Sequence, residues 1–373
     1  MKPRRLTAVT LAALTATLPL AACGTDDNSG LPGAVDFSAE TLRCAKESGT
    51  LLASGSSAQA NAMEVWVNTY QANCEGSQIN YKPTGSGAGI QEFLQGTTAF
   101  GGTDSLLTEG EVNESRSVCS HDGQSGRAVH LPMVAGPIAV AYHLPGVDEL
   151  VLDAETLGRI FDSQITRWND PAIAELNPGV DLPRLPITPF HRSDGSGTTD
   201  NFTSYLHAAA PDAWPYEPDK NWRGQGGQAA DGSSGLVGMV QQNEGAIAYF
   251  ELSYAHQNDI PTVLLDTGAE RPVAASVENS STAVAEARVV GRDGDLALEL
   301  DYTTSEEGAY PLVLITYEVV CDRGNNPDTL PLTRAFLRWT ASQEGQRALA
   351  DIDYAPIADD IIRRVRERVA DLS

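Results

Sequence analysis

Beyond residue 49, the chain alternates short apolar runs with segments whose apolar residues recur at helical spacing. Residues 50–53 form one such run, and four apolar residues follow it with a helical period: Ala62, Val65, Trp66 and Tyr70. The same succession of strand and helix is predicted at 79–94, 150–169 and 186–206, with Asp153 as an N-cap and Pro171 opening a short helix. This alternation predicts an α/β fold with a parallel or mixed sheet between helices.

Other stretches of the chain extend this pattern. Apolar runs predict further strands at 100–103, 137–144, 246–250 and 311–321. From Leu330 onward the spacing is helical, with a break near Pro356. Residues 224–238 are glycine-rich and predict a loop followed by a helix start, whereas residues 266–309 are acidic and polar and favour neither structure.

The N-terminus has the composition of an export signal. Residues 1–5 are basic, and residues 6–20 are apolar and uncharged but too short for a convincing membrane-spanning helix. The sequence LAAC at residues 20–23 resembles the lipobox of bacterial lipoproteins, and the polar stretch 24–30 would serve as a tether. We therefore predict a signal peptide at 1–22, lipidation of Cys23 and a tether at 23–43; the alternative is an ordinary secretory signal that contains a cysteine.

The composition limits the possible functions. The chain has 373 residues and a formal net charge of −25, which becomes −28 once residues 1–22 are removed with their three basic residues. The remaining length, roughly 350 residues, suits two domains or one large one. So acidic a chain argues against nucleic acid as a partner. We predict an exported protein held on the outer face of the cell membrane by its lipid.

The four cysteines beyond Cys23 predict two disulfides. They are Cys44, Cys74, Cys119 and Cys321, an even number in an oxidising location, without the CxxC pairs of a zinc site. Three pairings are possible. We favour Cys44–Cys74 and Cys119–Cys321, because Cys44 precedes the first strand and Cys74 ends the helix that returns antiparallel to it.

Three turns combine glycine and hydroxyl residues between a predicted strand and a helix. They lie at residues 54–57, 85–88 and 195–198. In an open α/β sheet such turns lie at the carboxyl ends of strands, where backbone N–H groups and helix N-termini bind anions. One such turn is more often a simple helix cap. Three together, with Arg192 and the strand-terminal Asp104, indicate a site for a tetrahedral oxyanion.

The same segments resemble a known family. GSGAGI at 85–90, FGGTD at 100–104 and RSDGSGT at 192–198 are similar to the phosphate-binding protein of bacterial phosphate ABC transporters, in the type II periplasmic-binding-protein-like group. Further similarity brings the match to most of 48–370. The resemblance implies two lobes, each a mixed sheet flanked by helices, joined by two crossover hinge strands. Lobe I would comprise 45–134 and 311–373, and lobe II would comprise 135–310.

The resemblance also assigns roles to individual residues. The phosphate-binding residues it implies are Ser57, Ala58, Ser86, Asp104, Arg192, Ser196, Gly197 and Thr198. Ser57 replaces the family's usual threonine and Ala58 an aromatic or aliphatic residue, but the hydroxyl and the backbone N–H are retained. Asp194 is expected to orient Arg192; the alternative is a plain turn residue. No catalytic residue, metal ligand or cofactor is expected.

Asp104 is the residue expected to select the anion. A carboxylate facing an oxyanion is repulsive unless the ligand donates a proton to it. Phosphate carries one or two protons near neutral pH, whereas sulfate carries none. The alternative is that Asp104 merely caps a helix after its strand.

Other functions remain as alternatives. Ser196 lies near His191 and Asp194, which could suggest a phosphatase, but the spacing differs from the G-x-S-x-G elbow. The site could bind another oxyanion such as sulfate or molybdate, or be vestigial in an adhesin or signalling lipoprotein. The family implies inorganic phosphate as ligand, transmembrane permease subunits as partners, and a monomer that closes around its ligand.

Overall fold

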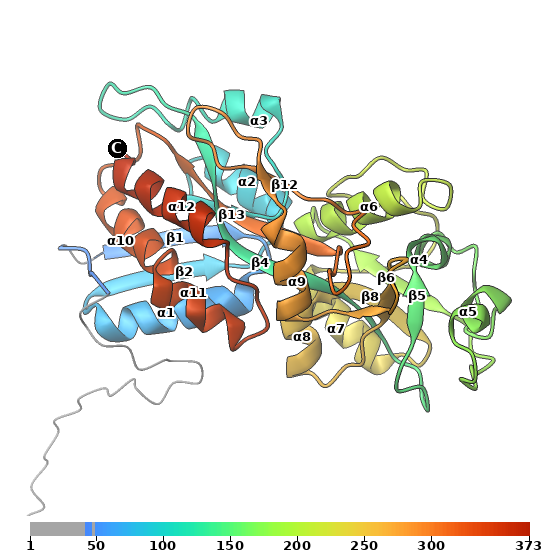
Figure 1. The fold of residues 1–373 in the computed structure, drawn as a ribbon. Helices are drawn as coiled ribbons and strands as arrows, with labels where there is room; N and C mark the ends of the chain where they lie inside the picture. The colour runs from blue at the N-terminus through green and yellow to red at the C-terminus, as the bar shows by residue number, and fades with distance from the viewer. Residues whose placement is uncertain (1–41, 47–48) are drawn as a thin grey trace, which may run out of the picture.

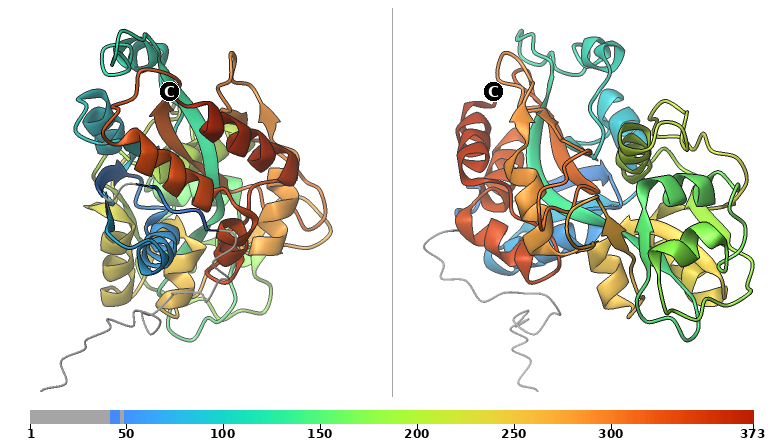
Figure 2. Two further views of the ribbon diagram at one scale, coloured as in Figure 1. Left: turned by 90° about the vertical axis from the view of Figure 1, so that its left-hand side faces the viewer. Right: turned by 45° about the vertical axis from the view of Figure 1, so that its right-hand side comes forward.

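The structure is a computed structural model that describes residues 42–46 and 49–373. The predicted signal peptide, Cys23 and the tether up to residue 41 lie outside the described residues. Figures 1 and 2 show two groups of helices and strands side by side, with the C-terminal helices covering the outer face of one of them. Within the described residues, no helix has both the length and the apolar character that crossing a membrane requires.

A mixed eight-stranded sheet runs through both lobes. Its order is β2 (Ser77–Lys82), β1 (Gly49–Gly55), β3 (Phe100–Thr103), β13 (Val313–Cys321), β4 (Ala128–Tyr142), β8 (Ala246–Glu251), β6 (Thr188–Arg192) and β7 (Gln228–Ala230). β1 is parallel to β2 and β3, and β6 is parallel to β7 and β8. β13 and β4 run antiparallel to their neighbours. The predicted α/β class is therefore correct.

β4 connects the two halves of the sheet. Up to Pro137 it pairs with β13, and from Ile138 it pairs with β8. A second connection lies beside it, because the N–H of Ile138 donates to the carbonyl of Leu312 (2.9 Å) and the hydroxyl of Tyr310 to the carbonyl of Ile138 (2.8 Å). These are the two crossovers of a two-lobed fold, and Figure 1 shows β4 extending from one lobe into the other.

Helices cover the sheet in each lobe. Those of the first lobe are α1 (Ala60–Asn73), α2 (Ser86–Leu94), α3 (Glu109–Glu114), α10 (Leu330–Thr340), α11 (Gln343–Ala350) and α12 (Asp359–Asp371). Those of the second are α4 (Ala154–Phe161), α5 (Pro171–Leu176), α6 (Gly197–Ala209), α7 (Gly232–Gln242) and α8 (Leu252–Gln257). The side chain of Asp153 caps α4 as predicted (2.7 Å to the N–H of Thr156), and Pro171 opens α5.

Two parts of the chain differ from the sequence prediction. β4 begins at Ala128, nine residues before the predicted start, and is buried throughout. The sequence prediction missed its first part because His130 and Pro132 interrupt the apolar run. Residues 266–309, which the sequence left unassigned, contain the end of β9 (Leu264–Asp266) and four further short elements: β10 (Val273–Ala274), α9 (Val277–Ala285), β11 (Arg288–Val289) and β12 (Leu298–Glu299). β9 and β10 form a small sheet with β5 (Val151–Asp153).

The segment around β11 and β12 packs on strands of the first lobe. The N–H of Leu296 donates to the carbonyl of His130 (3.1 Å), and the N–H of Leu298 donates to the hydroxyl of Tyr317 (3.2 Å). His130 lies on β4 and Tyr317 on β13, in the half of the sheet that belongs to the first lobe. This part of the chain therefore returns to the first lobe before β13 begins.

Both predicted disulfides are present. Cys44 is bonded to Cys74, and Cys119 is bonded to Cys321, with a Cα–Cα distance of 5.3 Å in each pair. The first fastens the segment before β1 to the end of α1. The second joins residues that are 202 positions apart and ties the region after α3 to the end of β13.

Candidate functional site

The three predicted turns lie where strands end and helices begin. The first follows β1, the second precedes α2 and the third joins β6 to α6. β1, β3 and α2 belong to the first lobe, whereas β6 and α6 belong to the second. The residues that the sequence assigned to the ligand are all buried: Ser57, Ala58, Ser86, Asp104, Arg192, Ser196, Gly197 and Thr198.

Hydrogen bonds between the lobes bring these turns together. The N–H of Gly87 donates to the carbonyl of Gly195 (2.8 Å), which joins the second turn to the third. The amide of Asn201, on α6, donates to the carbonyl of Asp104 (2.8 Å). The hydroxyl of Ser57 lies 3.0 Å from that of Ser233, at the start of α7. The structure therefore assembles all three turns into one buried site between the lobes.

Arg192 supplies the positive charge of the site. It is 2% exposed, and its Nε donates to Oδ1 of Asp194 (2.7 Å) while its Nη2 donates to Oδ2 of the same carboxylate. Burial by itself would raise the pKa of Asp194, but the hydrogen bonds and charge of Arg192 outweigh it and lower that pKa. The pair is thus a fixed fork, and Nη1 remains directed to the hydroxyl of Ser233 (3.3 Å).

Asp104 places a carboxylate opposite this arginine-bearing turn. Its Oδ2 accepts from the hydroxyls of Ser56 (2.6 Å) and Ser86 (3.2 Å), and its Oδ1 accepts from the hydroxyl of Thr316 (2.7 Å). Burial raises the pKa of Asp104 to about 6, while these hydrogen bonds oppose the rise. At neutral pH the group is therefore mainly a carboxylate, an acceptor within a site otherwise rich in donors.

The helix-cap alternative for Asp104 is wrong. The next helix, α3, is capped by Thr108, whose hydroxyl accepts from the N–H of Glu111 (3.2 Å). The carboxylate of Asp104 instead points toward the turns of the site, where it accepts hydrogen bonds from three hydroxyls. Its position is thus better explained by the site than by the start of a helix.

The N-terminus of α6 forms the opposite wall. Ser196 is the N-cap, and its hydroxyl accepts from the N–H of Thr199 (3.1 Å). The hydroxyl of Thr198 donates to Oε1 of Glu251 (2.7 Å), at the end of β8. A helix start of this kind presents N–H groups and a partial positive charge, which favour an anion.

The site also contains residues that the sequence analysis did not assign. Ser56, Ser233, Glu251 and Thr316 each bond directly to a predicted ligand residue. Two of them are polar residues in mostly apolar strands: Glu251 ends β8 and Thr316 lies in β13. A buried polar residue requires a partner, so an isolated polar position in a predicted core strand was a usable signal.

Gly197 is a point of close contact between the lobes. A Cβ added there would lie 2.6 Å from Cβ and Oδ2 of Asp104 and from Oγ of Ser86. Gly197→Ala is expected to hold the lobes apart and weaken anion binding, with an overpacking cost of about 1–3 kcal/mol. Calorimetric titration measures the change. Gly238→Ala, in the middle of α7 with only Gln242 nearby, is the matched control, and equal affinities for the two variants would contradict this role.

Neither a metal centre nor a catalytic pair is evident in the part of the chain that the structure describes. No group of three or more His, Cys, Asp or Glu side chains is placed there to hold a metal ion. The ring of His191 stacks on Trp222 at 4.7 Å, and its Nδ1 lies 3.0 Å from the carbonyl of Arg192. The hydroxyl of Ser196 is occupied with the α6 cap, so these contacts give no support to a serine nucleophile activated by His191.

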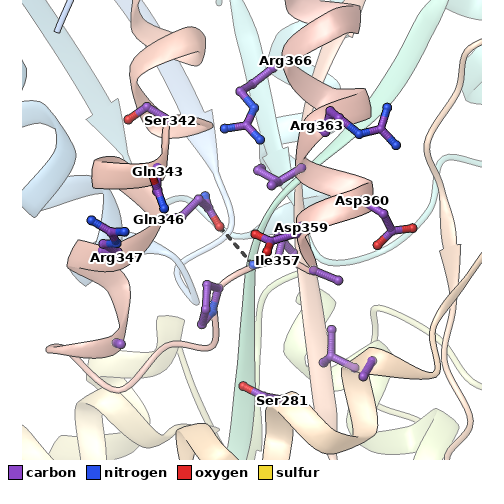
Figure 3. A pocket seen from close by; sticks show the side chains of 16 residues that line it. Ser281, Ser342, Gln343, Gln346, Arg347, Ile357, Asp359, Asp360, Arg363 and Arg366 are labelled. Atoms are coloured by element: carbon purple, nitrogen blue, oxygen red, sulfur yellow. Dashed lines mark hydrogen bonds between the residues drawn. The ribbon is translucent and has the colours of Figure 1, made fainter. Parts of the chain in front are cut away.

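A separate cavity lies away from this site. It has a volume of about 950 Å³ and lies among α9, α11 and α12. Figure 3 shows Arg347, Arg363 and Arg366 around it, and Gln346 accepting a hydrogen bond from the N–H of Ile357 (3.0 Å). None of the residues predicted to bind the ligand lines this cavity.

Comparison with known proteins defines the class to which this fold and site belong. Residues 44–344 match the PBP superfamily domain. The phosphate-binding protein PstS 3 of Mycobacterium leprae (strain TN) is 39% identical over 350 residues, 93% of each chain, and its namesake in Mycobacterium tuberculosis (strain ATCC 25618 / H37Rv) is 39% identical over 372 residues, 99% of each chain. This chain belongs to the PstS family of phosphate-binding proteins.

A solved structure shows the same fold at low sequence identity. The phosphate-binding protein from Stenotrophomonas maltophilia aligns with a TM-score of 0.68 at 18% identity, over 86% of this chain and 94% of that one. The two-lobed arrangement is therefore shared with proteins of very different sequence.

Proposed function

We propose that this protein binds inorganic phosphate between its lobes and delivers it to an ABC permease for import. Its relatives are named as phosphate-binding proteins over almost the whole length of the chain. The observation that carries the proposal is the pairing of donors and one acceptor in a single buried site. Arg192 and the start of α6 neutralise an anion, while the carboxylate of Asp104 accepts a hydrogen bond from a protonated oxygen of that anion.

The ligand contacts proposed here come from both lobes. Ser57, Ala58, Ser86 and Asp104 would hold phosphate from the first lobe. Arg192, Ser196, Gly197 and Thr198 would hold it from the second, with Asp194 fixing the guanidinium of Arg192. Because such contacts exist only when the lobes are together, phosphate would favour the closed form. The closed form would then be recognised by the transmembrane permease subunits.

The division into lobes that we propose follows the sheet pairing. Residues 45–134 and 311–373 form lobe I, and most of 135–310 forms lobe II. Residues 288–299 are better counted with lobe I, since they hydrogen-bond to β4 and β13. Hinge movement would then centre on the crossovers near Ile138 and Leu312.

We further propose that the protein is an exported, monomeric lipoprotein without enzymatic activity. The lipobox-like LAAC at residues 20–23 and the four cysteines beyond Cys23, all in disulfides, favour an extracytoplasmic location. Metabolic labelling with a radioactive fatty acid tests the anchor: Cys23→Ala should abolish incorporation. Labelling that persists in the variant would contradict lipidation at Cys23.

Titration calorimetry of the mature chain with phosphate tests the proposed function. We expect saturable binding of one phosphate per chain, little competition by sulfate, and no turnover of a chromogenic phosphate ester. If the titration shows no heat of phosphate binding, the binding proposal is overturned. Steady hydrolysis of the ester would instead favour a phosphatase.

A further inference from the structure

Glu318 is a buried carboxyl group of the first lobe. It lies in the middle of β13, is 1% exposed, and neither of its carboxylate oxygens has a hydrogen-bond partner among the described residues. Its neighbours in the sheet are Gly102 on β3 and Leu131 on β4. An ionised carboxylate in such a position is costly, so its protonation state requires an explanation.

A small polar cluster occupies the same face of the sheet. A Cβ on Gly102 would lie 2.3 Å from Nε2 of Gln59 and 2.4 Å from the hydroxyl of Tyr81. Gly102 stands directly opposite Glu318, and opposed residues of paired strands point to the same face. The side chain of Glu318 is therefore directed to the layer that holds Gln59 and Tyr81, where the glycine leaves room for them.

One proton would satisfy two unpaired atoms in this cluster. Gln59 is fully buried, and its Nε2 donates to the hydroxyl of Tyr81 (3.0 Å) while its Oε1 has no partner. A neutral Glu318 has an O–H that can donate to this oxygen, whereas an ionised Glu318 offers acceptors only. The unpaired Oε1 of Gln59 thus favours the acid form of Glu318.

The charges around Glu318 favour the same form. Asp104, which follows β3, and Tyr81, on β2, are the titratable groups that face it from the neighbouring elements. Gln59, Gly102 and Leu131 carry no charge. Burial raises the pKa of Glu318 to about 8; the nearby amide of Gln59 opposes this rise, and the charge of Asp104 adds to it.

The cluster connects directly to the anion site. The hydroxyl of Tyr81 donates to the carbonyl of Ser56 (2.8 Å), and the hydroxyl of Ser56 donates to Asp104. Thr316, two residues before Glu318 on the same face of β13, donates to the other oxygen of Asp104. Glu318 therefore lies behind the residues that position the Asp104 carboxylate.

We propose that Glu318 is held as a neutral acid that positions the Asp104 side of the site, and that its ionisation in alkaline solution weakens anion binding. Ionisation places a second negative charge behind Asp104, where it opposes the bound anion, and removes the proton shared with Gln59. This inference rests on the proposed phosphate function. Glu318 is a positioning residue because it acts through Ser56, Thr316 and Asp104 rather than by touching the ligand.

Phosphate titrations of the wild type and Glu318→Gln test this role. Near pH 6.5 we expect the two proteins to have similar dissociation constants. Near pH 9 we expect the wild type to bind phosphate about ten-fold more weakly than the variant, because one buried negative charge has been added near the site. Phosphate itself titrates over this range, but equally for both proteins, so their ratio isolates Glu318. Glu306→Gln, at an exposed position, is the control and should follow the wild type. If the ratio of the wild-type dissociation constant to that of Glu318→Gln does not change with pH, the proposal is overturned.

Thermal unfolding without ligand gives a second readout that does not depend on phosphate binding. A carboxyl whose folded pKa lies above its unfolded value stabilises the protein fully below the unfolded pKa and loses that contribution as pH rises through the folded one. The midpoint temperature of unfolding of the wild type should therefore fall relative to that of Glu318→Gln as the pH rises from about 5 to about 9. Parallel curves would show that Glu318 does not titrate as proposed, whether or not the protein binds phosphate. Glu318→Met repeats the comparison should the glutamine variant fold poorly.

Discussion

Arg192→Ala is expected to weaken phosphate binding by about 3–5 kcal/mol, or roughly 10²–10⁴-fold in the dissociation constant. Arg192 is the positive side chain of the site, it is buried, and its guanidinium is fixed by two bonds to Asp194. The alanine variant would lose a charge-assisted contact to the anion. It would also leave the partly buried carboxylate of Asp194 without its partner, which adds a negative charge where the anion binds.

Calorimetric titration of three variants distinguishes this effect from a general loss of positive charge. Arg271→Ala removes an exposed arginine that pairs with Glu307 and should bind phosphate like the wild type. Arg192→Lys keeps the charge but lacks the planar fork, so its affinity should lie between those of the wild type and Arg192→Ala. A near-wild-type dissociation constant for Arg192→Ala would show that the anion binds elsewhere.

Asp104→Asn should reduce the preference for phosphate over sulfate. Sites that require a ligand proton reject an analogue without one by roughly 10⁴–10⁵-fold, which sets the upper limit of the change. In the wild type, sulfate would face the Asp104 carboxylate with no proton to share. The asparagine amide can donate instead, so sulfate should bind far better while phosphate binds somewhat less well. Competition titrations of both anions measure the ratio.

The wild type itself provides an independent check of Asp104. Because burial raises the pKa of Asp104 to about 6, more acidic solutions protonate it and remove the repulsion of sulfate. Sulfate competition should therefore strengthen below about pH 6 in the wild type and change little in Asp104→Asn. Asp259→Asn, at an exposed position, should behave as the wild type. Unaltered selectivity in Asp104→Asn would place the discrimination in other residues.

Local patterns in the sequence were sufficient for most of the secondary structure. β1 and α1 follow from a buried run and a helical period, and Asp153 and Pro171 mark helix starts through chemistry within one turn. The disulfide between Cys44 and Cys74 also follows from a single strand–helix unit. Such features depend on neighbours close in sequence, which a periodicity analysis can evaluate.

The remaining features depend on contacts between distant parts of the chain. β4 contains His130 and Pro132 within a buried strand, so its first half gives no continuous apolar run. The bond between Ser57 and Ser233 joins residues 176 positions apart. Glutamate is usually exposed, yet Glu318 is buried because β3 and β4 flank it in the sheet. Sequence motifs indicated the anion site, but not the residues that support it from behind.

A crystal structure of the mature protein grown with phosphate near neutral pH would show whether the anion lies between Asp104 and Arg192. We expect one phosphate between the lobes, with one oxygen within hydrogen-bond distance of the Asp104 carboxylate and another bound by the guanidinium of Arg192. Phosphate found elsewhere, such as beside Arg347 and Arg366 in the cavity next to α12, with none between Asp104 and Arg192, would contradict it.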